Sequence, residues 1–470
     1  MSEQTSESNG ADSGVALSIT EQLVRLQRRQ VDIASRQRAA WHWLDWIGCV
    51  AAAHRAPAAQ ALMRWQPLGC AVGQTKTWPA LAGHACTDMQ AVWLDAGLAN
   101  IQEMDDMHRE AILHPGPVVL PVVAHVARHR ALDTQQALDA VVRGYETIVR
   151  VGRALGPTHY VRWHNTATAG VFGAAAAAAD ALGLSDVQTV WALGNAGTQA
   201  AGLWQVRLEP VMSKQLHTGH AAWAGLSAAS LAQADFTGPR YILEGEKGFF
   251  AALCPDAMPE RVLEPADVWL IHGTSFKPWP ACRHTHAVID CVLALRERLG
   301  AQAFEYSDAL VEGFGDAIRI CDQPRPQTAT EAKFSLQYAV AAAAHWGPLL
   351  PEHFDASQWG DATMQAAAGR VQLRIDAALS AAYPSHYGAR VTLRFADGSA
   401  HTAQVTDSLG DPERPMSEDQ ILAKARNLME YAGVAPVRMR AVLDGVLTLQ
   451  EQLGNGVSVP MPRALLDPLF

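Results

Sequence analysis

The chain has 470 residues, of which 49% are apolar and 18% are charged, a composition typical of a globular protein with a substantial core and unlike a disordered or fibrous chain. Its formal net charge of −10 gives no general attraction for a phosphate backbone, so we expect no nucleic-acid partner. An anionic substrate would need a local pocket of basic side chains, because the overall field of the protein repels it weakly.

Residues 1–17 are mostly polar and acidic, and they lack the basic start and apolar stretch of a secretory signal. We expect a disordered tail there. The most apolar stretch, VFGAAAAAADALGL, consists largely of weakly hydrophobic alanine and is interrupted by Asp180, so it falls short of a membrane span. These features predict a cytoplasmic protein with no membrane partner.

Residues 18–264 carry apolar side chains at three- and four-residue spacing, which predicts one large helical domain. Ser185 fits the N-cap of one of its helices. After residue 264, short apolar runs such as ALVEGF, GRVQLRID and ARVTLRFADG predict strands, so we predict a smaller α+β domain over residues 265–405. Residues 406–470 return to a helical pattern that could pack on the first domain or cap the second. The predicted fold class is mainly α.

Seven cysteines are scattered along the chain, with no Cys-x-x-Cys pair and no run of Cys and His at the spacing of metal ligands. An iron–sulfur hydratase would need three or four thiolates that converge on one cluster. We therefore expect reduced thiols and no metal site.

Several segments collect residues that could carry chemistry, and the first of them is EMDDMHREAILHPGP. It packs carboxylates and histidines into a short stretch that ends at a proline-marked loop. A solvated helix end with capping carboxylates would give this pattern, and so would carboxylates that orient a proton-transferring histidine. The candidates here are Glu103, Asp105, His108 and His114.

The next two segments, RWHNTATAG and MSKQLHTGHAAWAG, place histidines ahead of small-residue helices. His164 could help a helix N terminus to receive a carboxylate, although a simply capped helix explains the pattern equally well. Lys214, His217 and His220 share one face if their segment is helical, which suits anion binding or acid–base chemistry. A lone histidine, however, is more often a core or surface residue.

The last two segments are SFKPWPACRHTHAVID and AKFSLQYAVAAAA. In the former, two prolines stiffen a loop that carries Lys277, Arg283, His284 and His286 into an apolar helix. Arginine offers the planar geometry that a carboxylate prefers and lysine a mobile charge, so the segment looks like a substrate clamp. The latter places Tyr338 at the start of an Ala-rich helix, where a tyrosine usually belongs to an amphipathic core.

Taken together and in this order, these segments resemble the MmgE/PrpD family, which includes 2-methylcitrate dehydratase, cis-aconitate decarboxylase and iminodisuccinate epimerase. The resemblance covers nearly the whole chain and rests on DDxH…HPGxxVLP, WHxTxTxGxFGAAAAAAxxLGL, SKQLHTGHAAxAG, LEGEKGFF, KPWPACRHTHAVID and KFSLQY. It implies a large helical domain built from N- and C-terminal parts, an inserted α+β lid domain, and a homodimer. It also implies a site between the domains that uses no metal or organic cofactor.

Carried over position by position, the resemblance implies catalytic roles for five residues, which are His114, His164, Lys214, Lys277 and Tyr338. The residues expected to bind the substrate beside them are Glu103, Asp105, His108, His217 and Arg283. The chain departs from the family pattern where many members read DFDDT, because it has Glu103 for the leading aspartate and Met107 for the threonine. It also has Asn165 and Gln215 where prolines are common, and these changes bear on the choice of substrate.

The known chemistries of the family pass through a carbanion or enolate-like species next to a carboxylate, whose charge fixed cations stabilise. We expect the two lysines and Arg283 to hold carboxylates, one of the two catalytic histidines to transfer the α-proton, and Tyr338 or a second histidine to act as the acid. We predict a 2-methylcitrate dehydratase-like lyase that acts on a small polycarboxylic acid. The alternatives are an iminodisuccinate-type epimerase, a cis-aconitate-type decarboxylase and, from a different class, a non-catalytic binding protein.

Overall fold

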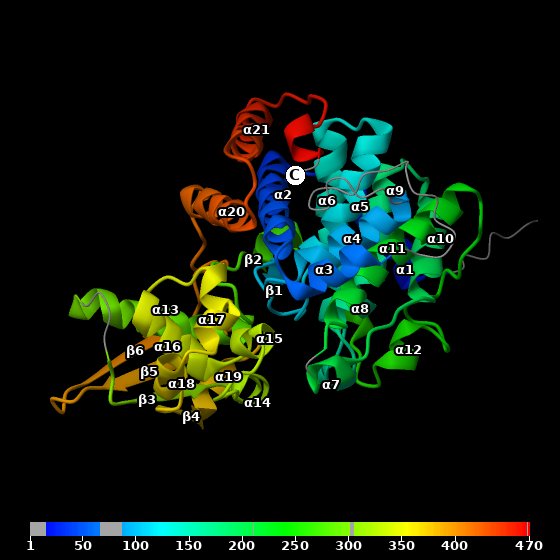
Figure 1. Ribbon diagram of the computed structural model, residues 1–470. Helices are drawn as coiled ribbons and strands as arrows, with labels where there is room; N and C mark the ends of the chain where they lie inside the picture. Colours follow the sequence, from blue (N-terminus) through cyan, green and yellow to red (C-terminus); the bar gives the residue numbers. More distant parts are fainter. Residues whose placement is uncertain (1–15, 66–86, 210, 301–304, 468) are drawn as a thin grey trace, which may run out of the picture.

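The computed structural model describes residues 16–65, 87–209, 211–300, 305–467 and 469–470. The predicted N-terminal tail lies outside these residues except for its last two positions. Within them the fold is mainly α, with a large helical domain and a smaller domain built on a sheet (Figure 1). None of the described helices combines the length and the hydropathy that a bilayer crossing requires.

The large domain takes its first helices from the N-terminal half of the chain. They are α1 (Ile19–Gln27), α2 (Ile33–Ala53), α3 (Pro57–Arg64), α4 (Asp88–Ala99), α5 (Gly116–Arg130), α6 (Thr134–Arg153), α7 (Pro157–Arg162), α8 (Asn165–Thr168), α9 (Gly170–Ala181), α10 (Asp186–Gly197), α11 (Lys214–Gln233) and α12 (Phe249–Leu253). Ser185 caps α10 as predicted, because its hydroxyl accepts a hydrogen bond from the backbone N–H of Gln188.

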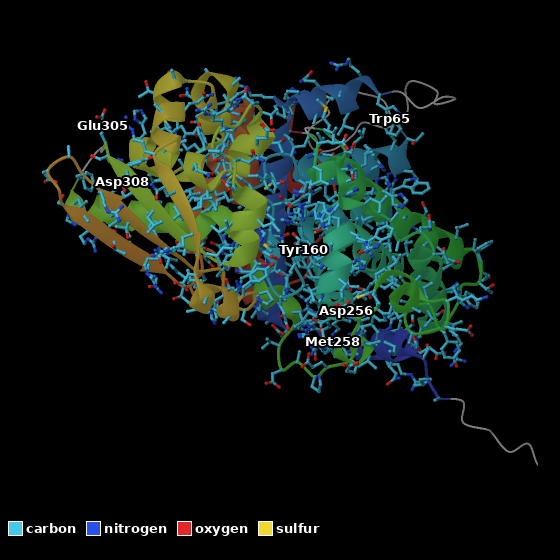
Figure 2. All side chains as sticks on the ribbon, turned by 90° about the horizontal axis from the view of Figure 1, so that it is seen from below. Trp65, Tyr160, Asp256, Met258, Glu305 and Asp308 are labelled. Carbon is cyan, nitrogen blue, oxygen red and sulfur yellow. The ribbon has the colours of Figure 1, made fainter. Side chains whose placement is uncertain are left out.

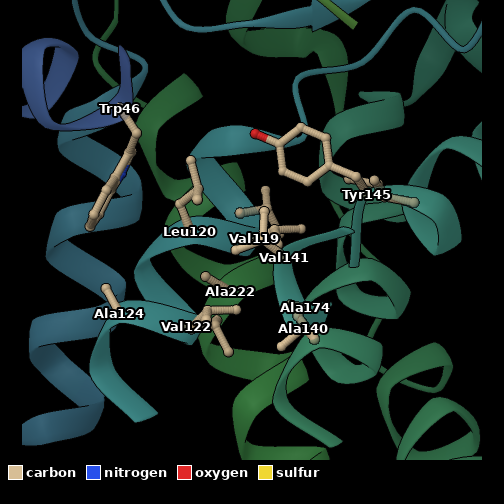
Figure 3. Close-up of a cluster of buried hydrophobic side chains, with 14 of the residues drawn as sticks. Trp46, Val119, Leu120, Val122, Ala124, Ala140, Val141, Tyr145, Ala174 and Ala222 are labelled. Atoms are coloured by element: carbon tan, nitrogen blue, oxygen red, sulfur yellow. The ribbon is translucent and has the colours of Figure 1, made fainter. Parts of the chain in front are cut away.

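Helix α9 lies at the centre of the large domain, and α5, α6, α10 and α11 pack around it. Every residue of α9 except Asp180 is buried. Small residues are needed because the neighbours approach closely: a Cβ on Gly225 of α11 would lie 2.3 Å from the Cβ of Ala174. Figure 3 shows part of this core, in which Val119 and Ala222 are among the side chains that fill the space.

The C-terminal helices α20 (Glu418–Ala432) and α21 (Pro436–Gly454) pack against α2. Their buried side chains, among them Met429, Val442 and Val446, join the core of the large domain. The sequence left open whether residues 406–470 pack on the large domain or cap the smaller one, and in the structure the two helices pack on the large domain. The large domain is therefore built from both ends of the chain, and the smaller domain is inserted between them (Figure 1).

The smaller domain contains a four-stranded sheet in the order β4-β3-β5-β6. Strand β3 (Asp308–Gly313) is parallel to β4 (Val371–Ile375) and antiparallel to β5 (Ala389–Arg394), which forms a hairpin with β6 (Ala400–Val405). The hairpin turns at the predicted Asp-Gly pair, where Gly398 has a φ of +85°. The helices of this domain are α13 (Arg283–Leu299), α14 (Gly315–Cys321), α15 (Ala329–Lys333), α16 (Leu336–Trp346), α17 (Ala356–Trp359), α18 (Ala362–Ala368) and α19 (Ala377–Ala382).

The domain boundary that we predicted between residues 264 and 265 differs from the structure. Trp269, Ile271 and Phe276 are buried in the core of the large domain. Strand β2 (Thr274–Ser275) also pairs with β1 (Met107–His108) of that domain. The change of composition after residue 264 marks the end of the regular helices but not the end of the core, so the smaller domain begins beyond Phe276.

Candidate active site

A pocket lies at the junction of the two domains, with an empty volume of about 570 Å³ including its open mouth. That size suits a small organic acid. Its charged and titratable lining includes Glu103, His114, His164, Arg207, Lys214, Lys277, Arg283 and His284. Tyr160, which also lines the pocket, is labelled in Figure 2 near the middle of the molecule.

The loop that leads into β1 is fixed by lysines from three different parts of the chain. Three consecutive carbonyl oxygens of this loop each accept a hydrogen bond from a buried lysine. The pairs are Lys333 of α15 with Gln102 (3.0 Å), Lys277 of the interdomain connection with Glu103 (2.7 Å), and Lys424 of α20 with Met104 (2.6 Å). Both domains therefore hold the loop that carries the acidic motif.

The side chain of Glu103 pairs with two of the predicted substrate-binding lysines. Its carboxylate contacts the ammonium of Lys214 and lies 3.5 Å from that of Lys277. The backbone of Glu103 has a φ of +55°, a conformation that few residues other than glycine adopt, and the hydrogen bond from Lys277 to its carbonyl supports it. The two lysines are thus arranged to take carboxylate oxygens, and a substrate carboxylate would compete with Glu103 for them.

His114 is oriented by a carboxylate, which is one of the two readings that the charge cluster in the sequence left open. Its Nδ1 lies 2.9 Å from Oδ2 of Asp105 and 2.8 Å from the carbonyl oxygen of Asp106. Burial opposes ionisation of Asp105, but the charges of His114 and Lys277 outweigh burial and hold the pKa of Asp105 well below its usual range. A proton on Nδ1 is therefore held by acceptors, and Nε2 is the nitrogen left for chemistry in the pocket.

Asp106, the next residue, fixes the backbone around His114 through its carboxylate. Its carboxylate accepts hydrogen bonds from the hydroxyl of Tyr145 (2.5 Å) and the backbone N–H of Gly116 (2.8 Å), and it lies 2.7 Å from Nδ1 of His42. A Cβ at Gly116 would lie only 2.8 Å from a carboxylate oxygen of Asp106, which explains the glycine of the HPG motif. The two aspartates of the acidic motif thus have different contacts: Asp105 orients His114, and Asp106 holds the backbone at Gly116.

His164, which lines the pocket, forms a pair of uncharged imidazoles with His217 behind it. Their Nδ1 atoms lie 3.1 Å apart, so one ring donates a hydrogen bond to the other. Burial and the nearby positive charge of Lys214 lower the pKa of His217 to about 4. Burial, together with the charges of His217 and Lys214, lowers the pKa of His164 far below its usual value. The helix that follows His164 is the single turn α8, because the Ala-rich helix begins only at Gly170.

Two arginines line the pocket, and they are engaged differently. Arg283 is 2% exposed and its guanidinium lies 2.5 Å from Asp411, so much of its charge serves an internal ion pair. Arg207 stacks on Trp204, with its guanidinium carbon 4.8 Å from the ring centroid. Among the residues that the structure describes, no carboxylate lies within ion-pair distance of Arg207. Arg207 was not among the predicted site residues, since LWQVRLEP carries no motif that would single it out.

Four predicted site residues are absent from the lining of the pocket, namely Asp105, His108, His217 and Tyr338. Asp105 and His217 contact the lining residues His114 and His164, whereas the other two are engaged elsewhere. The hydroxyl of Tyr338 donates a hydrogen bond to the carbonyl of His353 (2.5 Å), and its ring is buried in the core of the smaller domain. His108 accepts a hydrogen bond from the N–H of Ala111, and burial, reinforced by nearby arginines, lowers its pKa to about 3. We therefore correct the placement of both side chains: Tyr338 and His108 lie outside the pocket lining, and their polar atoms bond to the carbonyl of His353 and to the N–H of Ala111.

Models of two protein domains match the chain, namely the MmgE/PrpD N-terminal domain over residues 18–262 and the MmgE/PrpD C-terminal domain over residues 279–449. The chain belongs to the MmgE/PrpD family. The gap between the matches contains the stretch that the structure adds to the large domain.

Several MmgE/PrpD relatives are similar to this chain along most of its length. A cis-aconitate decarboxylase-like protein oryM of Aspergillus oryzae is 26% identical over 88% of this chain and 90% of the relative. A cis-aconitate decarboxylase of Aspergillus terreus is 25% identical over 96% of both chains, and the one of Mus musculus is 23% identical over 77% of this chain and 75% of its own. The chain is thus a relative of lyases that act on polycarboxylic acids.

Proposed function

We propose that this chain is a decarboxylase that removes carbon dioxide from a small unsaturated tricarboxylic acid of the cis-aconitate type. The observation that carries the proposal is the presence of Lys214, Lys277 and Arg207 in the lining of the same pocket as the carboxylate-oriented His114. The curated relatives, which are named as cis-aconitate decarboxylases, support this choice over the dehydratase that the sequence alone favoured.

The pocket contains what the binding of a tricarboxylate requires. Lys214 and Lys277 take one carboxylate in competition with Glu103, and Arg207, whose guanidinium is stacked on Trp204, takes another. Fixed cations beside the substrate would stabilise the negative charge that develops when carbon dioxide leaves.

The reaction then needs one bond cleavage and one proton transfer. The bond between carbon and the departing carboxylate breaks, carbon dioxide leaves, and the bonding pair stays in the conjugated system beside a second carboxylate. Nε2–H of a protonated His114 delivers a proton to carbon, while Asp105 stabilises the imidazolium until the proton has moved. Water returns a proton to His114, so each turnover consumes one proton and releases one carbon dioxide.

Dehydration of a hydroxylated tricarboxylate such as 2-methylcitrate is the second candidate. Elimination of water needs a base at carbon as well as an acid at the departing hydroxyl. The uncharged imidazole of His164 offers such a base in the same pocket as His114, since its pKa is too low for it to carry a proton at neutral pH. The site therefore holds the groups for either reaction.

Proton NMR of the purified chain in deuterated water distinguishes the candidates. The panel contains cis-aconitate, 2-methylcitrate, citrate and iminodisuccinate. We expect cis-aconitate to lose carbon dioxide and the product to gain deuterium at carbon. Formation of an alkene from a hydroxy acid alone would favour the dehydratase, deuterium exchange without net loss would favour an epimerase, and no change in any compound would reject the proposal.

A further inference from the structure

Three potential metal ligands meet beside the pocket at the ends of two helices of the smaller domain. Cys282 caps the N terminus of α13, His284 lies in its first turn, and Cys321 is the last residue of α14. One ligand atom from each lies within 4.8 Å of the other two, and Nδ1 of His284 is 3.2 Å from Sγ of Cys282. Cys282 and His284 also line the pocket, so the cluster opens toward it.

The surroundings hold these side chains in place. The backbone N–H of Cys282 donates to the carbonyl of Lys333 at 2.9 Å, and the ring of His284 stacks on that of Tyr387 with centroids 5.4 Å apart. Cys282, His284 and Cys321 are 7%, 6% and 0% exposed, and both cysteines are free thiols. Nε2 of His284 has no hydrogen-bond partner in the described part of the chain, although it is buried. The missing partner of Nε2 does not itself argue for a metal ion, because Nδ1 is the nitrogen that lies beside Sγ of Cys282.

Two thiolates and one imidazole form a donor set that is typical of zinc sites in proteins. Zinc–sulfur bonds of about 2.3 Å and zinc–nitrogen bonds of about 2.0 Å place tetrahedral ligand atoms roughly 3.5–3.8 Å apart. The ligand atoms of the three residues lie 3.2 Å (Sγ of Cys282 to Nδ1 of His284) to at most 4.8 Å apart. Side-chain shifts of about 1 Å or less would therefore bring them to tetrahedral distances. Two ionised thiols carry two negative charges, which a divalent cation neutralises. Three protein ligands and an open fourth position are the pattern of zinc sites that bind water or a substrate oxygen.

We propose that Cys282, His284 and Cys321 form a Cys₂His site for a zinc-like divalent cation, with the fourth coordination position open to the pocket. This inference goes beyond the decarboxylation proposed above, which uses none of these three residues. No metal site was expected from the sequence, because the chain has no Cys-x-x-Cys pair and no run of Cys and His at the spacing of metal ligands. The structure brings Cys321 to Cys282 and His284 from a separate helix, which local spacing does not reveal.

A second group, His386, Asp407 and Glu413, serves as an internal comparison. Its ligand atoms also lie within 4.8 Å of one another. However, the guanidinium of Arg109 donates hydrogen bonds to Asp407 (2.8 Å) and to Glu413 (2.7 Å). The guanidinium of Arg109 already neutralises these two carboxylates, so we expect no metal ion to bind to this second group.

The test is a titration of the reduced, chelator-treated full chain with Co²⁺ alone, followed by Zn²⁺. We expect one Co²⁺ per chain with an intense thiolate-to-cobalt charge-transfer absorption, which Zn²⁺ abolishes. The variant C321S should weaken binding by at least about a hundredfold, since even outer-shell partners of a metal are worth about 10- to 100-fold. The matched control H386N should bind Co²⁺ like the original chain. A chain without the charge-transfer band, or a C321S variant that retains it, would overturn the proposal.

A measurement on the unaltered chain guards against a variant that fails to fold. Cysteine alkylation is mapped by mass spectrometry on the reduced chain, with and without one equivalent of Zn²⁺. We expect Zn²⁺ to slow the modification of Cys282 at least about tenfold, because a coordinated thiolate is a poorer nucleophile. Equal rates overturn the proposal, and so does the appearance of a Cys282–Cys321 disulfide in a chain whose reduced form takes up no metal.

Discussion

Replacing Lys333 by methionine (K333M) tests how the smaller domain holds the acidic loop. Lys333 is fully buried, and its ammonium donates to the carbonyl and to the side-chain oxygen of Gln102 at 3.0 Å and 2.7 Å. Burial, with the charge of Lys277 adding to it and that of Glu103 opposing it, lowers the pKa of Lys333 from 10.5 to about 7. The folded chain therefore holds this proton less tightly than the unfolded chain does.

The sign and size of the effect follow from that difference. Between pH 7 and 10.5 the unfolded chain keeps the proton on Lys333 while the folded chain has lost it, so stability rises with pH in this window. At about 1.4 kcal/mol per pKa unit, a fall from 10.5 to about 7 means that the charged lysine destabilises the folded chain at pH 7 relative to pH 10.5 by an amount on the order of 5 kcal/mol. Methionine keeps the length and removes the titration, while it leaves the acceptors on Gln102 unpaired at a cost of about 1–3 kcal/mol.

Urea unfolding of both chains at pH 7, 8, 9 and 10 measures the effect. We expect the free energy of unfolding of the original chain to gain on that of K333M by several kcal/mol from pH 7 to pH 10. The same substitution at the exposed Lys247 (K247M) is the matched control, and its stability difference from the original chain should not change with pH. A K333M difference that stays constant with pH, or falls, would refute the reasoning.

Three further substitutions test the roles assigned in the pocket. D105N removes the charge that orients His114, so we expect kcat for cis-aconitate to fall about 10²- to 10⁴-fold with a smaller change in KM; an unchanged kcat contradicts the role. R207M removes a side-chain cation that binds a substrate carboxylate, so KM should rise about 10- to 100-fold. The exposed control R298M should leave KM unchanged, and equal KM values for R207M and the original chain would reject Arg207 as a substrate ligand. E103Q removes the carboxylate that competes for Lys214 and Lys277, so calorimetry should show the tricarboxylate binding about tenfold more tightly, and weaker binding would assign Glu103 to substrate recognition instead.

The sequence predicted those parts of the site that lie close together along the chain. One of the two readings of the acidic motif was that carboxylates orient a histidine, and the structure has such a contact between Asp105 and His114 at 2.9 Å. The strands of the smaller domain were also readable, because alternation along ARVTLRFADG reflects a sheet with one buried face. Local patterns carry this information because they are set by neighbours within one element.

The remaining features depend on contacts between distant elements. Arg207 reaches the pocket only because Trp204 supports its guanidinium, and no spacing in the sequence encodes that contact. The family resemblance implied a catalytic role for Tyr338, whereas its hydroxyl donates a hydrogen bond to the carbonyl of His353 within the smaller domain. The stretch around Phe276 has no regular helix, so its membership of the large core could not be seen before the fold was known.

The most direct test of the proposed activity is the rate of carbon dioxide release from cis-aconitate, followed by mass spectrometry, for the original chain and for H114Q. The account predicts steady release by the original chain and a rate at least about a hundredfold lower for H114Q, in which circular dichroism shows an unchanged fold. Absence of release by the original chain, or equal rates for the two chains, would contradict the assignment of His114 as the proton donor of a decarboxylase.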